Sequence, residues 1–277
     1  MKRACVIGWP IEHSRSPLIH GYWLRTLGIA GSYTREPVRP EDLAEFLSSL
    51  AASGFAGCNV TVPHKEAALA LADERDAAAV AIGAANTLWL ENGRLHASNT
   101  DAIGYMTYLD VKAPQWRKRD QPVLILGAGG AARAIAYGFL EAGAGRVRVC
   151  NRSRERGESL ARHFGPRVEA CDWDVRDELA REASVIVNTT TLGMKGQGDP
   201  GLDFSGVRPD TVVSDIVYVP LETEFLASAR RSGLATVDGL GMLLHQAVPG
   251  FERWFGVRPK VTPELYDLVR ADIERPA

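Results

Sequence analysis

The stretch VLILGAGGAARAIAYGFLEA, residues 123–142, decides the fold of the second half of this chain. Its four opening apolar residues predict a buried strand, and the apolar spacing over 131–142 predicts a helix. The turn between them has G-x-G-x-x-A form. Gly127 permits a tight turn, Gly129 lets backbone amides approach a phosphate, and Ala132 lets the helix pack closely on the strand. A tight turn without a ligand is the alternative, but the flanking strand and helix favour a bound dinucleotide.

The end of the next predicted strand, residues 146–150, bears on the choice of dinucleotide. An NAD-binding fold usually places a carboxylate about 20 residues after the glycines, for the ribose 2′-hydroxyl. Asn151 stands at that place here, and Arg152 follows it. A guanidinium offers paired donors and a permanent charge to a 2′-phosphate, so the sequence favours NADP. Arg154 fits the solvated face of a helix equally well, which makes Arg152 the stronger candidate.

The rest of the chain alternates apolar runs with helical stretches, which is typical of an α/β fold. A polar break at 112–121 divides it into two parts. In the first part we expect strands at 4–7, 32–37 and 57–62, helices at 17–27, 40–52 and 73–83, and a hairpin of 86–90 with 94–97 around Asn92-Gly93. In the second part we expect further strands at 184–188, 211–216 and 236–237 and a helix at 154–163, forming a parallel sheet wrapped by helices. Two last helices, at 242–255 and 263–273, are expected to pack back on the first part.

Composition limits the classes of partner. The 277 residues are 45% hydrophobic, enough for a real core, and the net charge of −2 provides no field for nucleic acid or an acidic membrane. Four scattered cysteines, without metal-ligand spacing, predict core thiols and neither disulfides nor a metal site: Cys5, Cys58, Cys150 and Cys171. The chain enters a strand-like run directly, with no signal peptide or spanning segment, so we expect a cytoplasmic protein with a small-molecule partner. The oligomeric state stays open, a homodimer being one option.

Polar residues gather in three segments of the first part: residues 13–17, 59–65 and 99–101, with 86–87 nearby. The first two follow predicted strands, whose carboxyl ends are where α/β folds bind ligands. Hydroxyls and amides suit a polyhydroxylated substrate. Lys65 can deliver or remove the proton that accompanies hydride transfer, with Asp101 orienting it in one coupled site. Each residue has a plain alternative: Ser14 or Ser16 as a helix cap, Asn99 and Asp101 as turn residues, Lys65 as a solvated helix start.

Taken in order, these segments resemble the shikimate dehydrogenase family over nearly the whole chain. The match rests on the following ordered motifs: Gly8-x-Pro10-x-x-His13-Ser14-x-Ser16-Pro17, Asn59-Val60-Thr61-x-Pro63-x-Lys65, Gly83-Ala84-x-Asn86-Thr87, Asn99-Thr100-Asp101, Gly127-Ala128-Gly129-Gly130-Ala131, Asn151-Arg152-Ser153-x-x-Arg156, Asp215-x-x-Tyr218 and Gly239-x-Gly241-Met242-Leu243-x-x-Gln246. Two departures are Gly21, where the family often has Asn, and Thr189-Thr190-Thr191 after Asn188. Neither touches Lys65 or Asp101.

The resemblance implies a role for each motif. Ser14 and Ser16, helped by Tyr218, would hold the substrate carboxylate. Ring hydroxyls would bind to Thr61, Asn86, Asp101 and Gln246, with Lys65 as the catalytic acid and base. NADP would bind to the glycine loop (Gly127, Ala128, Gly129, Gly130, Ala131), to Asn151, Arg152, Ser153 and Arg156, and to Thr190, Met194, Ile216, Gly239 and Met242.

The resemblance also implies an architecture and a reaction. A substrate-binding domain, residues 1–104 and 242–277, would face a Rossmann-type NADP-binding domain, residues 105–241, across a cleft. The reaction would be the reversible reduction of 3-dehydroshikimate to shikimate with NADPH, in the route to aromatic amino acids.

Three other functions compete with this one. A quinate-preferring relative often alters one serine of the pair or carries an acid after the second Rossmann strand, and neither change occurs here. The Ser14/Ser16 pair and Gln246 speak against a methylenetetrahydrofolate dehydrogenase. A catalytically silent NADP-binding regulator would not need both Lys65 and Asp101.

Overall fold

The computed structural model of the protein describes residues 1–118 and 120–275. By packing, the chain divides into one unit of residues 1–101 and 244–269 and a second unit of residues 102–243, with which 270–275 are grouped. Each unit holds a six-stranded sheet with helices, so the predicted α/β fold with two α/β parts is confirmed. The predicted boundaries, after residue 104 and before residue 242, divide a substrate-binding domain from an NADP-binding domain. That division by function stays a prediction. Residue 119 of the predicted polar break, and residues 276–277, lie outside the described residues.

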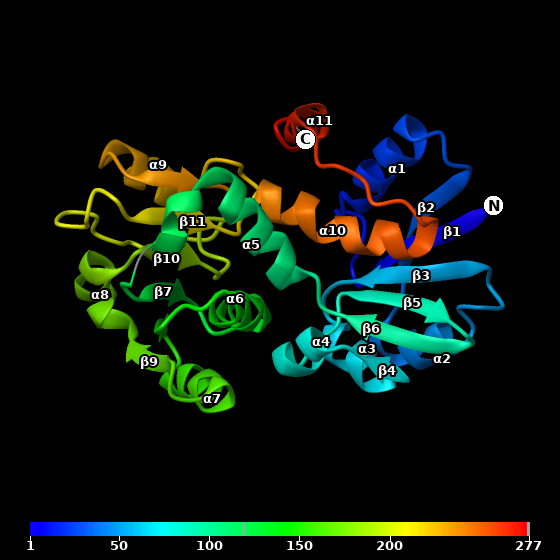
Figure 1. Cartoon of the computed structure of the whole chain (residues 1–277), viewed down its shortest axis with the longest axis horizontal. Helices are drawn as coiled ribbons and strands as arrows, with labels where there is room; N and C mark the ends of the chain where they lie inside the picture. Colours follow the sequence, from blue (N-terminus) through cyan, green and yellow to red (C-terminus); the bar gives the residue numbers. More distant parts are fainter. Residues whose placement is uncertain (119, 276–277) are drawn as a thin grey trace. The chain divides into compact units, whose positions relative to one another are not determined.

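The first unit combines a mixed sheet with helices from both ends of the chain (Figure 1). Short 3-10 helices are labelled η. Its elements are β1 (Lys2–Gly8), α1 (Ser16–Thr26), β2 (Gly31–Pro37), η1 (Pro40–Asp42), α2 (Leu43–Ser48), β3 (Phe55–Val60), α3 (Lys65–Leu71), β4 (Glu74–Arg75), α4 (Ala77–Ile82), β5 (Thr87–Glu91), β6 (Arg94–Ser98), the greater part of α10 (Leu240–Phe255), and α11 (Pro263–Ile273).

The sheet of the first unit has the order β2-β1-β3-β5-β6-β4. On one face, alternate residues of the strands form a core with apolar residues of α2 and α3. At the other face, the indole of Trp254 in α10 donates to the carbonyl of Leu88 at 2.9 Å. Gly57 permits this contact, because an added Cβ would lie 2.3 Å from the indole nitrogen. The prediction that this late helix packs on the first part of the chain is therefore confirmed.

The predicted helix over 73–83 is wrong in its first half. Asp73 and Asp76 donate their backbone amides to the carbonyls of Leu95 and Ala97, at 2.9 and 3.0 Å, which places β4 beside β6. The helix starts only at Ala77, with the Asp76 carboxylate accepting from the Ala79 amide at 2.7 Å as its N-cap. The alanine-rich pattern did not reveal this competition from a neighbouring strand.

The second unit alternates strands and helices (Figure 1). Its elements are α5 (Asp101–Lys112), η2 (Pro114–Lys118), β7 (Val123–Leu126), α6 (Gly130–Glu141), β8 (Val147–Asn151), α7 (Arg154–Phe164), β9 (Val168–Asp172), η3 (Trp173–Val175), α8 (Arg176–Glu182), β10 (Val185–Asn188), β11 (Val212–Asp215), α9 (Glu224–Arg231) and β12 (Ala235–Val237). Every strand pair in this sheet is parallel, as predicted.

The strand order of the second unit, β12-β11-β10-β7-β8-β9, reverses at β7. After β7 the chain builds β8 and β9 on one side and then returns to build β10 on the other. In open α/β sheets, ligands bind outside the carboxyl ends of the strands at such a reversal. The predicted glycine turn follows β7 and so lies at this point of the sheet.

Candidate functional site

Several strand ends of the first unit meet at one edge of its sheet. β1 and β3 are parallel neighbours, with Ile7 opposite Val60, so the loops that follow them leave at the same edge. β5 begins there because it is antiparallel to β3, and β6 ends there because Thr87 lies opposite Ser98. This edge receives all the predicted polar segments of the first unit: residues 13–17, 59–65, 86–87 and 99–101.

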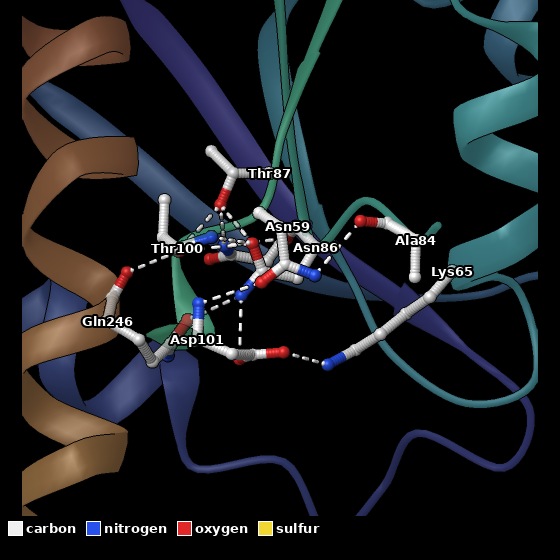
Figure 2. Close-up of polar contacts among 9 residues, drawn as sticks. Asn59, Lys65, Ala84, Asn86, Thr87, Thr100, Asp101 and Gln246 are labelled. Atoms are coloured by element: carbon white, nitrogen blue, oxygen red, sulfur yellow. Dashed lines mark hydrogen bonds and ion pairs between the residues drawn. The ribbon is translucent and has the colours of Figure 1, made fainter. Parts of the chain in front are cut away.

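Lys65 and Asp101 form an ion pair at this edge (Figure 2). Lys65 is the first residue of α3 and Asp101 the first of α5, and the ammonium donates to Asp101 Oδ2 at 2.6 Å. The position suits the carboxylate, because the N-terminus of a helix carries partial positive charge. The Lys65 side chain is 30% exposed and that of Asp101 only 13%. The ammonium is therefore the member of the pair that a ligand reaches more easily.

Asn86 holds the other oxygen of Asp101 (Figure 2). Its amide nitrogen donates to Asp101 Oδ1 at 2.8 Å and to the side-chain oxygen of Gln246 in α10 at 3.3 Å. Its amide oxygen accepts from the backbone of Thr100 at 2.8 Å and from the hydroxyl of Thr87 at 3.0 Å. Lys65, Asn86, Asp101 and Gln246, which we call the site cluster, are thus joined by hydrogen bonds. All four are predicted site residues.

A buried chain of hydrogen bonds supports the site cluster from below. Asn59 donates its side-chain amide to the backbone oxygen of Asn86 at 3.1 Å and to the hydroxyl of Thr87 at 3.2 Å. This fixes the amide so that its oxygen accepts from the Tyr33 phenol at 2.6 Å. The ring of His20 stacks on Tyr33 with centroids 3.9 Å apart, and burial lowers the pKa of His20 to about 3. His20 is therefore uncharged and packs as a neutral ring against Tyr33.

Ser14, Ser16 and Thr61 lie at the same sheet edge. Ser16 is buried at the start of α1, and its backbone amide donates to the Ser14 hydroxyl at 3.3 Å. The carbonyl of Ser14 accepts from the guanidinium of Arg35 at 2.6 Å. Thr61 packs its methyl group against Gly8, where an added Cβ would lie 2.6 Å away. The loops after β1 and β3 therefore contact each other directly.

The glycine turn of the second unit has the geometry of an anion site. Gly127 has a φ of +107°, and an added Cβ would lie 2.7 Å from the hydroxyl of Thr189. At Gly129 and Gly130 an added Cβ would meet nothing within 4 Å, so their backbone faces open space. The twelve-residue helix α6 starts there with no side-chain cap. Its first amides, which have no partner within the helix, can bind a phosphate.

The predicted arginines that follow β8 are of two kinds in the described part of the chain, paired and unpaired. Arg154 pairs with Glu158 at 2.9 Å and with Asp172 at 3.1 Å, so it is committed to the surface of α7. Arg152 and Arg156 are exposed, and among the described residues no carboxylate pairs with either. Asn151 donates to the backbone oxygen of Ser153 at 2.8 Å and shapes the turn. Arg152 and Arg156 therefore keep their guanidinium groups available for a phosphate.

The remaining predicted cofactor residues follow β10, β11 and β12. Thr190 donates its hydroxyl to the side chain of Asn188 at 2.7 Å, and Met194 is exposed in the same loop. Gly239 packs against the backbone of Ile216, because an added Cβ would lie 2.4 Å from the Ile216 carbonyl. Met242, in α10, and Tyr218, after β11, are both half-buried.

The sequence did not identify the groups that position these side chains. Asn59, Thr87 and Thr100 lay inside polar segments without an assigned role. Tyr33 gave no signal, because a tyrosine in a strand pattern usually indicates only packing. Asp215 did give one: a carboxylate ends an apolar strand, and in the structure it is fully buried.

Within residues 1–118 and 120–275, no helix is long and apolar enough to cross a membrane. In the same residues no group of three metal-ligating side chains comes together. The four cysteines are free; three are buried and Cys171 is half-buried.

Three family models match successive parts of the chain. "Shikimate dehydrogenase substrate binding domain" matches residues 6–88, "Shikimate / quinate 5-dehydrogenase" matches residues 109–193, and "Shikimate 5'-dehydrogenase C-terminal domain" matches residues 239–263. The matches fall in both units of the structure.

Individual proteins match nearly full length. A Brucella canis protein named shikimate dehydrogenase (NADP(+)) is 57% identical over 99% of this chain and 96% of its own length. The structure of shikimate 5-dehydrogenase from Thermus thermophilus, in complex with NADP(H) and shikimate, has a TM-score of 0.87 at 37% identity, covering 99% of this chain and 100% of that one. Quinate dehydrogenase from Corynebacterium glutamicum, in complex with NAD, has a TM-score of 0.90 at 30% identity, covering 98% and 100%.

Proposed function

The chain belongs to the shikimate dehydrogenase family, and from this premise we propose which of its residues bind shikimate, which bind NADP and which transfer the proton. It is an NADP-dependent shikimate dehydrogenase, an oxidoreductase that reversibly reduces 3-dehydroshikimate to shikimate with NADPH.

The ion pair of Lys65 and Asp101 is the observation that carries the catalytic assignment. Its 2.6 Å separation lets the two groups share a proton site, and Asn86 fixes the carboxylate from its other side. In the direction of reduction, the Lys65 ammonium donates a proton to the oxygen of the substrate carbonyl. In the reverse direction, the same pair removes the proton from the hydroxyl. Asp101 orients the Lys65 side chain and stabilises its ammonium form, the form before reduction and after oxidation.

The other residues of this edge bind and orient the ring. Asn86 and Gln246 offer amide donors and acceptors beside the catalytic pair, and Thr61 offers a hydroxyl, so together they suit ring hydroxyls. Ser14 and Ser16 hold the carboxylate at the loop after β1, where Arg35 brings a positive charge against the Ser14 carbonyl. The contact of Tyr218, in the second unit, with this carboxylate stays a prediction.

The residues of the second unit fit NADP. The open backbone at Gly129 and Gly130 and the uncapped start of α6 suit the pyrophosphate, with Ala128 and Ala131 adding small residues to the turn. Arg152 and Arg156 suit the 2′-phosphate, with Asn151 and Ser153 shaping their turn. Thr190, Met194, Ile216, Gly239 and Met242 flank the nicotinamide end. When bound, NADPH supplies the hydride for the reduction.

A cytoplasmic location and a homodimeric state complete the proposal. Sedimentation of the purified protein tests the second.

Steady-state kinetics over four combinations of substrate and cofactor test the proposed function. We expect the highest kcat/KM for shikimate with NADP, because Asn151 and Arg152 replace the acid that favours NAD. Quinate is the second candidate, since one matching structure is a quinate dehydrogenase in complex with NAD. A higher kcat/KM for quinate with NAD would overturn the assignment.

A further inference from the structure

Asp215 is the most deeply buried carboxylate beside the predicted dinucleotide site, and the reaction as described does not use it. It is the last residue of β11, fully buried, and next to Asn188 at the end of β10. β10 lies beside β7 at the reversal of strand order. The loop after β10 contacts the glycine turn, since Thr189 donates its amide and hydroxyl to the Leu126 carbonyl at 2.9 and 2.7 Å. Asp215 is thus one strand away from the dinucleotide-binding turn.

The carboxylate of Asp215 joins three segments. Oδ1 accepts from the side-chain amide of Asn188 at 3.0 Å and from the backbone amide of Val217 at 2.9 Å. Oδ2 accepts from the hydroxyl of Thr223, the N-cap of α9, at 2.7 Å. All three partners donate to the ionised carboxylate, whose two oxygens only accept. A protonated carboxyl group keeps Oδ1 as an acceptor, but its O–H becomes a donor, so the bond with the Thr223 hydroxyl must reverse or break.

Asn188 passes this constraint to the loop over residues 188–194. With its amide hydrogens held by Asp215 and by the Leu192 carbonyl at 2.9 Å, its oxygen accepts both the backbone amide of Thr190 at 3.1 Å and the Thr190 hydroxyl at 2.7 Å. Gly193, with a φ of +99°, lets the loop return to within 3.6 Å of Asp215, measured from an added Cβ. The carboxylate therefore helps to fix the path of this loop, together with the bonds of Thr189 to the Leu126 carbonyl.

We propose that Asp215 is a positioning residue for the dinucleotide: in its ionised form it holds the 188–194 loop and the backbone at Ile216 and Val217 in the arrangement that binds NADP(H). The proposal rests on the proposed function, because it concerns how tightly that cofactor binds. Asp215 acts on cofactor binding only through Asn188 and the backbone, without touching the cofactor.

The ionisation of Asp215 falls in an accessible range of pH. Burial raises its pKa to about 6, against the opposing hydrogen bonds from Thr223, Val217 and Asn188, and the charge of Asp199 raises it further. Below that pH the carboxyl group acquires a proton and becomes a donor, so the Thr223 hydroxyl can no longer donate to Oδ2 as it does to the ionised group. We then expect the affinity for NADPH to fall because Asp215 is protonated, independently of any titration of the cofactor itself.

The test is direct binding of NADPH, followed by its fluorescence, to the wild type and to Asp215→Asn between pH 5 and pH 8. The 2′-phosphate also titrates near pH 6, so the ratio of the two Kd values at each pH is the readout. Asparagine has one accepting oxygen, and we expect a Kd about tenfold higher than that of the wild type at pH 8. The ratio should fall to within about twofold at pH 5, because the wild-type side chain is then protonated.

A second pair of variants protects the test against misfolding. Thr223→Val removes one donor and should raise the Kd by about threefold at pH 8, whereas Thr223→Ser keeps the hydroxyl and should match the wild type. Asp210→Asn, just before the start of β11, is the control for a lost carboxylate and should leave the Kd unchanged.

Three outcomes would overturn the proposal. They are a Kd ratio near one at every pH, a raised ratio that does not change with pH, and equal binding by the valine and serine variants at position 223. A wild type that binds no NADPH would instead refute the proposed function.

Discussion

Asn86 uses both of its amide hydrogens inside the first unit, one on Asp101 and one on Gln246. A ring hydroxyl that binds Asn86 must therefore take the place of one existing bond. The bond to Gln246, at 3.3 Å, is the longer and weaker of the two, so it is the one that a ligand replaces. We expect the bond to Asp101 to persist during the reaction and to keep the carboxylate in place beside Lys65.

Replacement of Lys65 by alanine should lower kcat by about 10²- to 10⁴-fold, the usual contribution of a positioned acid or base. The loss belongs to proton transfer, so the Kd for NADPH should remain within about twofold of the wild-type value. Single-turnover kinetics and NADPH titration measure the two effects separately.

Lys2→Ala, which removes an exposed lysine at the start of β1, is the control for loss of a positive charge. Wild-type-like kcat in Lys65→Ala would rule out the proton-transfer role of this side chain.

Single residues could be predicted from the sequence where chemistry and spacing coincide. Lys65, Asn86 and Asp101 of the site cluster lie in short polar segments, whereas Gln246 lies in α10 and was named only by the family resemblance. Tyr33 and Asn59, which hold the cluster from below, were not assigned. Their role depends on which strand lies beside which, and a strand pattern does not contain that information.

At the scale of elements, we expect the junction of β8 and α7 to set the preference for NADP. Arg152→Ala should raise the Kd for NADPH by about tenfold or more and leave NADH binding nearly unchanged, because only NADPH carries a 2′-phosphate. Titration of both cofactors measures the difference.

Arg154→Ala is the matched control at this junction. That guanidinium is already paired with Glu158 and Asp172, so its loss should change neither Kd by more than about twofold. Equal losses of NADPH and NADH in Arg152→Ala would contradict the assignment.

The contact of α10 with the sheet of the first unit depends on Gly57. In Gly57→Ala the new methyl group would lie 2.1 Å from the Leu88 carbonyl and 2.3 Å from the Trp254 indole nitrogen. Backbone cannot move aside as a flexible side chain can, so we expect a loss of about 3 kcal/mol or more in the free energy of unfolding. Urea denaturation followed by tryptophan fluorescence measures it.

Gly145→Ala provides the comparison, because an added Cβ there meets nothing within 4 Å. This substitution should change the free energy of unfolding by no more than about 0.5 kcal/mol. An equally small loss at Gly57 would show that α10 is free to move away from the sheet.

Helices and strands could be predicted where the period of the apolar residues agrees with the residues found in the turns. The hairpin of β5 and β6 turns at Asn92 and Gly93, which have φ values of +52° and +76°, as Asn-Gly predicts. The helices α3, α5, α8 and α9 and the strand β9 were not predicted. Of these, α9 begins at a Thr223 cap that a search for N-cap residues would have found.

At the scale of the whole molecule, one buried group in each unit predicts that the two units respond to acid in opposite ways. Burial lowers the pKa of His20, in the first unit, from 6.5 to about 3, and its contribution to stability is present above pH 6.5 and lost as the pH falls. Burial raises the pKa of Asp215, in the second unit, from 3.8 to about 6, and its contribution is present below pH 3.8 and lost as the pH rises. Between the unfolded-state and folded-state pKa of each group, its contribution to the free energy of unfolding changes by about 1.4 kcal/mol per pH unit.

Between pH 6 and pH 4, acidification should therefore weaken the first unit and strengthen the second. Hydrogen exchange of the two units, corrected for the intrinsic rate at each pH, should show protection falling in one and rising in the other. In Asp215→Asn the rise in the second unit should disappear while the fall in the first persists. Parallel changes in both units of the wild type would contradict the two burial effects.

The first unit is assembled from two distant pieces of the chain, with residues 102–243 of the second unit between them. During synthesis, we expect the sheet of the second unit to form before α10 is translated, because its last strand, β12, ends at Val237. The first unit must wait for α10, which supplies both the Trp254 contact that covers its sheet and the Gln246 side chain of its site. A nascent chain released before this helix would therefore hold a folded dinucleotide-binding half and no working site, so catalytic competence arrives only with the last residues to be translated.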